Sequence, residues 1–363
     1  MNKLLLYAIE NNASDIHITA NKDCWIRING VFKKYERVIK ITEIDEFVEL
    51  IVPSVNEKYV NMREKRYIYP IDCAFKYMGR RFRANMYLGV DGINMALRLL
   101  RDKISSVEEL LLPKETEMFS DIRSGLFIVV GTTGSGKSTT LAAIIDKINK
   151  TRSENILTIE EPVEYIHTPC KSRIEQIEVG EHIDSFDRAT VAAMRQNPNV
   201  ILVGEMRDID TMQNVITLAK TGHAVYATLH AKSVTDTIDR IIDVFPHEQQ
   251  EQMRIQLASV LRGVLHQTLL KNRCGGMLPL VEQLVIDDVT ASMITSGQKS
   301  NNIRDTMRSR SALGNVHIAD NAIWHIQNGR LNIEDVKPYL SSADYAIVNS
   351  VIPNKEVRGD FRG

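Results

Sequence analysis

The 363-residue sequence lacks the features of a membrane or exported protein. No apolar run approaches the ~20 residues that a membrane-spanning helix needs. The first ten residues, MNKLLLYAIE, reach a charge after a short apolar patch and contain no small-residue cleavage site, so they do not match a signal peptide. We therefore expect a soluble, cytoplasmic protein that contacts a membrane only through partner proteins.

Paired cysteines and an excess of one charge are also missing. The four cysteines lie far apart without a C-x-x-C pair, which argues against a zinc module and fits reduced thiols in the cytosol. The formal net charge is −1 and aromatic residues make up 6%, so no nucleic-acid partner is expected. Hydrophobic residues make up 44%, and the length allows two domains, each with its own core.

What the sequence does contain is a phosphate-binding motif. An apolar segment, 126–130, runs into GTTGSGKS and then into a helical pattern, which is the G-x-x-x-x-G-K-S spacing in a strand–loop–helix context. Glycines let backbone N–H groups point at phosphate oxygens, and the helix N-terminus adds partial positive charge. The predicted nucleotide-binding residues are Gly131, Thr132, Thr133, Gly134, Ser135, Gly136, Lys137, Ser138 and Thr139.

Two residues of this motif carry the expected chemistry. Lys137 can reach the β- and γ-phosphates of a nucleoside triphosphate, and the Ser138 hydroxyl can bind Mg²⁺. The alternative, an ordinary Gly/Ser turn before a helix, would not require every fixed position to be filled. The motif therefore predicts a nucleoside triphosphate-binding protein.

Carboxylates follow two other predicted strands. VILVGE brings Glu205 to the end of a core strand, where an acid in P-loop enzymes holds Mg²⁺ through water. LTIEEPVEY places Glu160, Glu161 and Glu164 at the end of another strand, where one of them could orient or deprotonate the attacking water. These residues alone leave open which of the three is the base, and a solvated acidic turn is the alternative.

Two histidines, His223 and His230, flank the predicted strand 225–229. Seven steps of extended chain span roughly 23 Å, so the two imidazoles cannot share a metal ion unless the chain folds back. A γ-phosphate sensor at one end and a contact to a neighbouring subunit at the other fit better than a zinc pair.

Arginines recur on the predicted strands 80–87 and 94–99, where Arg81, Arg83 and Arg98 are the candidates. Exposed strand arginines are usually solvated or paired. The alternative is an arginine finger that acts on the nucleotide of an adjacent subunit.

Apolar periodicity divides the chain into two domains joined by a linker over 101–113. Residues 1–100 predict a small mixed α/β domain with a helix over 44–62 and an Asn29-Gly30 hairpin turn. Residues 114–363 predict a parallel sheet, because strands alternate with helices. Its expected strands are 126–130, 156–159, 200–204 and 225–229, and its expected helices are 137–150, 185–196, 209–221 and 248–270, followed by a helical region from about 280 and a loose tail.

Taken in order, these motifs resemble those of the secretion-superfamily hexameric ATPases, and within them the type IV pilus retraction ATPase (PilT) family. The resemblance covers nearly the whole chain, and it is carried by the segments 13–18, 81–83, 131–138, 158–165, 203–208 and 222–230. It implies a PAS-like N-terminal domain and a RecA-like ATPase domain in a homohexameric ring, with ATP and Mg²⁺ as cofactors. It also implies that ATP hydrolysis drives pilus retraction and twitching motility.

The same resemblance implies residue roles. Glu164 becomes the general base, Glu205 the acid on the Mg²⁺ side, and His223 and His230 sensors. The finger candidates are Arg81, Arg83 and Arg98. The implied partner is an inner-membrane platform protein, which would hold the ring at the cytoplasmic face of the membrane.

Two departures from the family pattern leave alternatives open. Glu161 stands where the family usually has Asp. Ser292 and Met293 stand where retraction ATPases carry Arg and Asn of an A-I-R-N-L-I motif. An assembly ATPase of a related pilus, or a type II or type IVb secretion ATPase, is therefore the alternative, and a RecA-like nucleic-acid motor is a second one from a different class.

Overall fold

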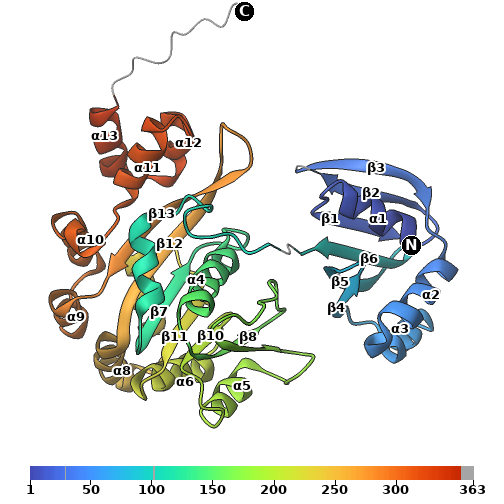
Figure 1. Ribbon diagram of the computed structural model, residues 1–363, viewed down its shortest axis with the longest axis horizontal. Coiled ribbons are helices and arrows are strands. Elements are labelled where there is room, and N and C mark those ends of the chain that lie inside the picture. Colours follow the sequence, from blue (N-terminus) through green and yellow to red (C-terminus); the bar gives the residue numbers. More distant parts are fainter. Residues whose placement is uncertain (29, 101–102, 353–363) are drawn as a thin grey trace, which may run out of the picture. The chain divides into compact units, whose positions relative to one another are not determined.

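The computed structural model describes residues 1–28, 30–100 and 103–352 (Figure 1). Contacts divide the chain into two compact units, of which the first comprises Met1–Lys103 with Glu164–Ile166 and the second Ile104–Val163 with His167–Gly363. The predicted turn at Asn29, the first two linker residues and the predicted tail over 353–363 lie outside the described residues. Within the described ranges, no helix is both long and apolar enough to cross a membrane.

The first unit is a six-stranded antiparallel sheet in the order β3-β2-β1-β6-β5-β4, with helices on one face. Its elements are α1 (Asn2–Glu10), β1 (Asp15–Thr19), β2 (Asp23–Ile28), β3 (Val31–Val38), α2 (Ile41–Ile51), the 3₁₀ turn η1 (Pro53–Val55), α3 (Asn56–Arg63), β4 (Ile71–Tyr77), β5 (Arg80–Gly89) and β6 (Gly92–Leu99). The predicted helix over 44–62 is wrong as a single helix, because Pro53 has no N–H to continue the ladder.

Side chains alternate between the two faces of this sheet. In β5, Phe82, Ala84 and Met86 are buried in the core that α1, α2 and α3 cover. Arg81 and Arg83 alternate with these residues in sequence and therefore point to the opposite, polar face.

The second unit contains a seven-stranded sheet in the order β13-β12-β7-β11-β10-β8-β9, parallel except for the β12–β13 pair. Its strands are β7 (Gly125–Val130), β8 (Asn155–Glu160), β9 (Arg173–Glu178), β10 (Val200–Val203), β11 (Ala224–Leu229), β12 (Leu261–Lys271) and β13 (Met277–Val285). Its helices are η2 (Lys114–Asp121), α4 (Lys137–Thr151), α5 (Phe186–Ala193), α6 (Ile209–Lys220), α7 (Val234–Asp243), α8 (His247–Val260), α9 (Asp288–Thr295), α10 (Ser300–Ser309), η3 (Ser311–Leu313), α11 (Ile318–Gln327), α12 (Ile333–Val336), η4 (Lys337–Tyr339) and α13 (Ser342–Val351).

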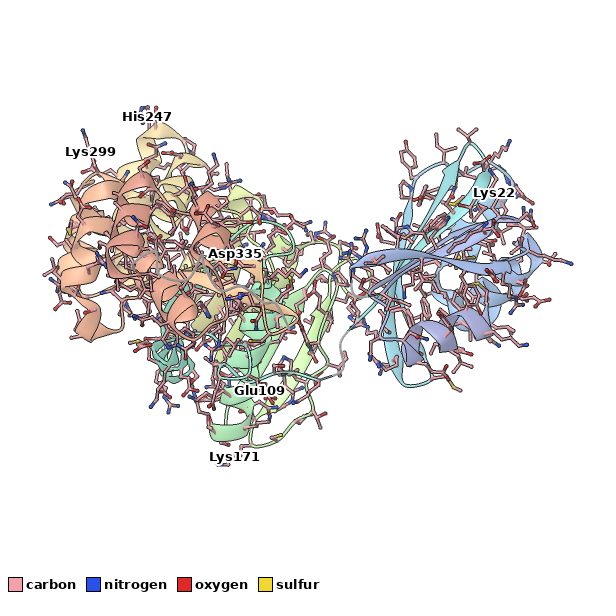
Figure 2. All side chains as sticks on the ribbon, turned by 90° about the horizontal axis from the view of Figure 1, so that it is seen from above. Lys22, Glu109, Lys171, His247, Lys299 and Asp335 are labelled. Atoms are coloured by element: carbon pink, nitrogen blue, oxygen red, sulfur yellow. The ribbon has the colours of Figure 1, made fainter. Side chains whose placement is uncertain are left out.

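Helices cover both faces of this sheet, which confirms the predicted α/β fold (Figure 1). Alternate residues of β7 belong to two cores, Leu126 and Ile128 to the one beneath α5–α8 and Phe127 and Val129 to the one beneath η2 and α4. Every residue of β7 is buried, as a central parallel strand requires. The outer surface of the second unit carries charged and polar side chains. His247 and Lys299 project outward from it (Figure 2).

The four predicted parallel strands are confirmed, but the predicted helix over 248–270 is half wrong. Helix α8 ends at Val260, and the chain continues directly as β12. The run LRGVLHQTLLK is apolar enough to fit either period, and its position between β7 and β13 decides for a strand. Strands β9 and β13 were not predicted either.

Candidate active site

The phosphate loop lies at the carboxyl end of β7, between two neighbouring strands, β11 and β12. Its backbone requires glycine, because φ is +149° at Gly131, +78° at Gly134 and +89° at Gly136. A Cβ at Gly131 would also lie 2.3 Å from the backbone oxygen of Gln267. The loop therefore packs against β12 in a way that no side chain at its first position would allow.

Lys137 opens helix α4 and folds back over the loop. Its Nζ donates hydrogen bonds to the carbonyl oxygens of Gly131 and Thr132, both at 3.1 Å. Ser138 follows in the first turn of α4 and is half-buried. The ammonium group and the hydroxyl thus lie at the loop, as the motif predicts.

The loop fits a phosphate group on two observations. Nothing occupies the space where a Cβ of Gly134 would stand, so a ligand could approach its backbone closely. The Ser135 hydroxyl is buried and has no hydrogen-bond partner among the described residues. A Mg²⁺ ion bound with the nucleotide would take its ligands from the Ser138 hydroxyl, water and phosphate oxygens, in the way this ion prefers.

His230 joins the loop to Glu205. The histidine follows β11 and its Nδ1 lies 3.2 Å from the Gly131 carbonyl oxygen, while its Nε2 lies 3.1 Å from Oε1 of Glu205. Glu205 follows β10, the strand next to β11. The carboxyl ends of three parallel strands therefore bring together residues that are far apart in the sequence.

Arg207 extends this chain of contacts and was not among the predicted site residues. Its guanidinium donates to Oε2 of Glu205 at 2.8 Å and to Oε2 of Glu161 at 2.5 Å. Burial lowers the pKa of Arg207, but the two carboxylates outweigh it and leave the pKa above its ordinary value. The only signal in the sequence is its place two residues after Glu205.

The three acids after β8 have different surroundings. Glu160 is 8% exposed and accepts a hydrogen bond from the Thr158 hydroxyl at 2.7 Å. Glu161 contacts Arg207. Glu164 is half-buried and belongs to the segment grouped with the first unit. Glu160 and Glu161 are thus held by neighbours, and Glu164 stays the predicted base.

His223 lies at the opposite edge of the sheet from the loop. It precedes β11, its carbonyl accepts from the N–H of Gly125 at the start of β7, and its Nδ1 lies 2.9 Å from the Leu218 carbonyl. Within the second unit it is therefore separated from the loop by the length of β11, and the structure does not bring it together with His230.

The finger candidates lie on the polar face of the first unit. Arg83 and Arg98 are directly opposite each other on β5 and β6, and Asp15 is opposite Arg98 on β1. Nε of Arg98 lies 2.9 Å from Asp15, although the Arg98 side chain remains 66% exposed. Arg81 lies two residues before Arg83 on the same strand. Together with Asp72, Arg83 and Arg98 line an open hollow of about 700 Å³.

Gln267 is a second residue that sequence reasoning missed, since it was placed in a predicted helix. It lies in β12, next to the loop, and its side chain contacts both Ser135 and Thr140. No motif marks it, because a buried glutamine in an apolar run has no distinctive spacing.

Comparisons with known proteins agree with this geometry. A family model described as "Type II/IV secretion system protein" matches residues 1–352. The chain is 36% identical over 306 residues to the type IV pilus retractation ATPase PilT of Pseudomonas aeruginosa, covering 82% of this chain and 88% of that one. It is 32% identical over 351 residues to the type IV pilus ATPase PilU of the same organism, covering 94% and 89%. A crystal structure of the pilus retraction motor PilT with bound ADP is similar with a TM-score of 0.82 and 35% identity, covering 94% of this chain and 97% of that chain.

Proposed function

The chain belongs to the type II/IV secretion system protein family, and we propose that it is an ATPase motor that drives retraction of a type IV pilus. Two of its similar proteins are named for pilus retraction, and one was crystallised with ADP. The proposal includes assembly as a homohexameric ring and engagement of an inner-membrane platform protein.

The observation that carries the proposal is the link between the phosphate loop and Glu205 through His230. A loop that only held a nucleotide would not need an acid and an imidazole at the same edge. Here a change at the γ-phosphate could move His230, and with it Glu205 and Arg207. This is the arrangement expected of an enzyme that hydrolyses ATP and transmits the change to its fold.

The chain's own residues divide the work. The loop N–H groups and Lys137 would hold the β- and γ-phosphates, and Ser138 with Glu205 would hold Mg²⁺, the latter through water. Bound Mg²⁺ would offset the charge on the phosphates during hydrolysis. Glu164 would accept a proton from the attacking water, and His230 would report the γ-phosphate to Glu205. Arg81, Arg83 and Arg98 are proposed to act on the nucleotide of a neighbouring subunit.

Deletion of the gene in the native cell, with complementation by variants, tests this function. Wild type should restore twitching, and Lys137→Ala should not, while cells without the motor should carry excess surface pili. Lys150→Ala is the matched control, because Lys150 lies in the last turn of the same helix and its ammonium group pairs with Asp146 at 2.6 Å, away from the loop. Phosphate release by purified Lys137→Ala at the wild-type rate would contradict the ATPase assignment.

An assembly or secretion ATPase is the second candidate, because of Ser292 and Met293. Both lie in α9, where Met293 is 9% exposed and packs into the core beneath α5–α8. Met293 therefore places a buried apolar side chain where the retraction motif has a polar one. Bald cells after deletion, in place of excess pili, would favour this candidate.

A further inference from the structure

The phosphate loop rests on one buried side chain of β12. In the pairing of β12 with β7, His266 is opposite Val130, so Gln267 comes next to Gly131, where the loop begins. Gln267 is 1% exposed, and β7 separates its strand from β11, which leads to His230, while β7 and β11 separate it from β10, which leads to Glu205.

The carboxamide of Gln267 makes two hydrogen bonds to the nucleotide-binding segment. Its Nε2 donates to the carbonyl oxygen of Ser135 at 2.5 Å, and its Oε1 accepts from the hydroxyl of Thr140 at 2.7 Å. Ser135 is in the loop, whereas Thr140 is in the first turn of α4, so a single planar group spans both. A Cβ at Gly136 would lie 2.9 Å from the same Nε2, which places the loop directly on this amide.

We propose that Gln267 is a positioning residue for nucleotide binding, which ties the phosphate loop to α4 and keeps the loop in the shape that receives phosphate. The inference rests on the proposed function only in taking the ligand to be ATP or ADP. Gln267 does not touch the ligand, and it acts by fixing the direction of the Ser135 carbonyl and hence of the N–H groups that follow it.

The expected consequence of losing this amide is weaker binding of both nucleotides. Without it, the Ser135 carbonyl and the Thr140 hydroxyl would be buried without partners, and the loop would leave its binding shape to find water. The apparent affinity then falls by the fraction of molecules that keep the binding shape. Because the loop holds the same phosphates before and during hydrolysis, the KM for ATP rises while kcat changes little.

The chain offers a matched control in Gln283 on the adjacent strand, β13. Gln283 is 0% exposed, accepts from the Thr116 hydroxyl at 2.7 Å and donates to the Gly314 carbonyl at 2.8 Å. It therefore has the same burial and the same pair of bonds as Gln267, but its partners lie outside the phosphate loop. Gln283→Leu should reduce stability as Gln267→Leu does without altering nucleotide binding.

The test measures KM and kcat for ATP and the Kd for ADP by titration calorimetry, using the full-length assembled protein. Gln267→Leu should raise both KM and Kd by about tenfold, whereas Gln283→Leu should leave both within about twofold of wild type. A lower folded fraction reduces the measured turnover but moves neither KM nor Kd, so a purely structural role gives a different pattern. Equal KM and Kd values in the two variants would overturn the proposal.

A second variant keeps the test decisive if Gln267→Leu does not fold. Gln267→Glu preserves size and the acceptor for Thr140 but turns a carboxylate oxygen toward the Ser135 carbonyl, so it should also raise the Kd for ADP. Thr140→Val breaks only the other bond and should have the smaller effect. A Gln267→Glu protein with wild-type Kd would refute the positioning role. Because ADP binding needs no hydrolysis, a wild type without ATPase activity would reject the proposed function while leaving this inference standing.

Discussion

The two sheets of this protein present their polar residues in different ways. In the first unit, strands are antiparallel and side chains alternate, so Arg83, Arg98 and Asp15 share a broad face. In the second unit, parallel strands are buried on both faces, and the polar groups of the candidate site collect where the strands end, as at Gly131, Glu205 and His230.

This difference follows from how each sheet is covered. Helices pack on one face of the first sheet and leave the other face to water, whereas helices on both faces of the second leave only its edge. A face can contact another macromolecule, and an edge can enclose a small ligand. The comparison assigns phosphate binding to the second unit and makes the arginine face a candidate contact with another subunit.

The largest expected effect is the loss of turnover on replacing Arg98, and it would show that the polar face of the first unit also takes part in catalysis. If Arg98 is a finger for a neighbouring nucleotide, Arg98→Ala should lower kcat by about 10³-fold or more. Mixing inactive Arg98→Ala and Glu164→Gln subunits should then restore activity, since mixed rings contain sites with both wild-type residues. The measurement is phosphate release from rings assembled out of the mixture.

Arg27→Ala is the control for this experiment. Arg27 pairs with the same carboxylate, Asp15, on the same face. The Arg27→Ala protein should remain active by itself, and mixing it with Glu164→Gln subunits should not raise its activity. Activity that merely follows the dilution of each inactive subunit would restrict catalysis to the second unit.

Glu205→Gln tests the site at the carboxyl ends of the parallel strands of the second sheet. Removing this charge should lower activity by about 10- to 100-fold and raise the Mg²⁺ concentration needed for half-maximal turnover, because a group that orients a metal's water has effects of this size. Glu175→Gln, an exposed carboxylate on the edge strand β9 paired with Arg173, should behave as wild type. An unchanged Mg²⁺ requirement in Glu205→Gln would remove the metal role.

His223 and His230 lie at opposite ends of β11, so replacing each in turn compares the amino and carboxyl ends of the strands of the second sheet. His230→Ala breaks the link between Gly131 and Glu205 and should reduce kcat by about tenfold. His223→Ala should stay within about twofold, because His223 lies at the opposite edge. The measurement is steady-state ATP hydrolysis, and an equally large loss in His223→Ala would point to a contact with a neighbouring subunit.

Lowering the pH should destabilise the second unit more than the first, and this is the smallest of the expected effects. Burial lowers the pKa of His167 and of His325 to about 4 from an ordinary value of 6.5. Between pH 6.5 and 4 these two histidines therefore bind protons in the unfolded chain but not in the folded second unit. The free energy of unfolding is highest above pH 6.5 and decreases as the pH falls toward 4. By pH 5 the loss is about 2 kcal/mol for each histidine. The first unit has one histidine, His17, which is exposed.

The two tryptophans allow this loss to be measured for each unit. Trp25 is in the first unit and Trp324 in the second, so Trp324→Phe and Trp25→Phe proteins each report on one unit by fluorescence during thermal unfolding. Between pH 7.5 and 5 the midpoint reported by Trp324 should fall further than that reported by Trp25. Parallel shifts would contradict a special role for buried histidines.

Local patterns predicted the parts of the fold that depend on consecutive residues. The phosphate loop, the acid after an apolar strand and the alternation of strands and helices were all found in this way and are present. Prediction failed for β12, because its apolar sequence fits a helix as well as a strand. Its pairing with β7 and β13 makes it a strand, and this pairing is not visible in the local sequence.

By itself, the sequence determined that a glycine-rich loop with Lys137 and Ser138 follows a buried strand, since the short spacing of a loop constrains its backbone directly. Only the tertiary structure decided which distant residues meet that loop. It placed His230 and Glu205 on it, left His223 at the other edge and set Gln267 beneath it. The physical reason is that the order of strands in a sheet differs from their order in the chain, so neighbours across strands leave no mark in sequence spacing.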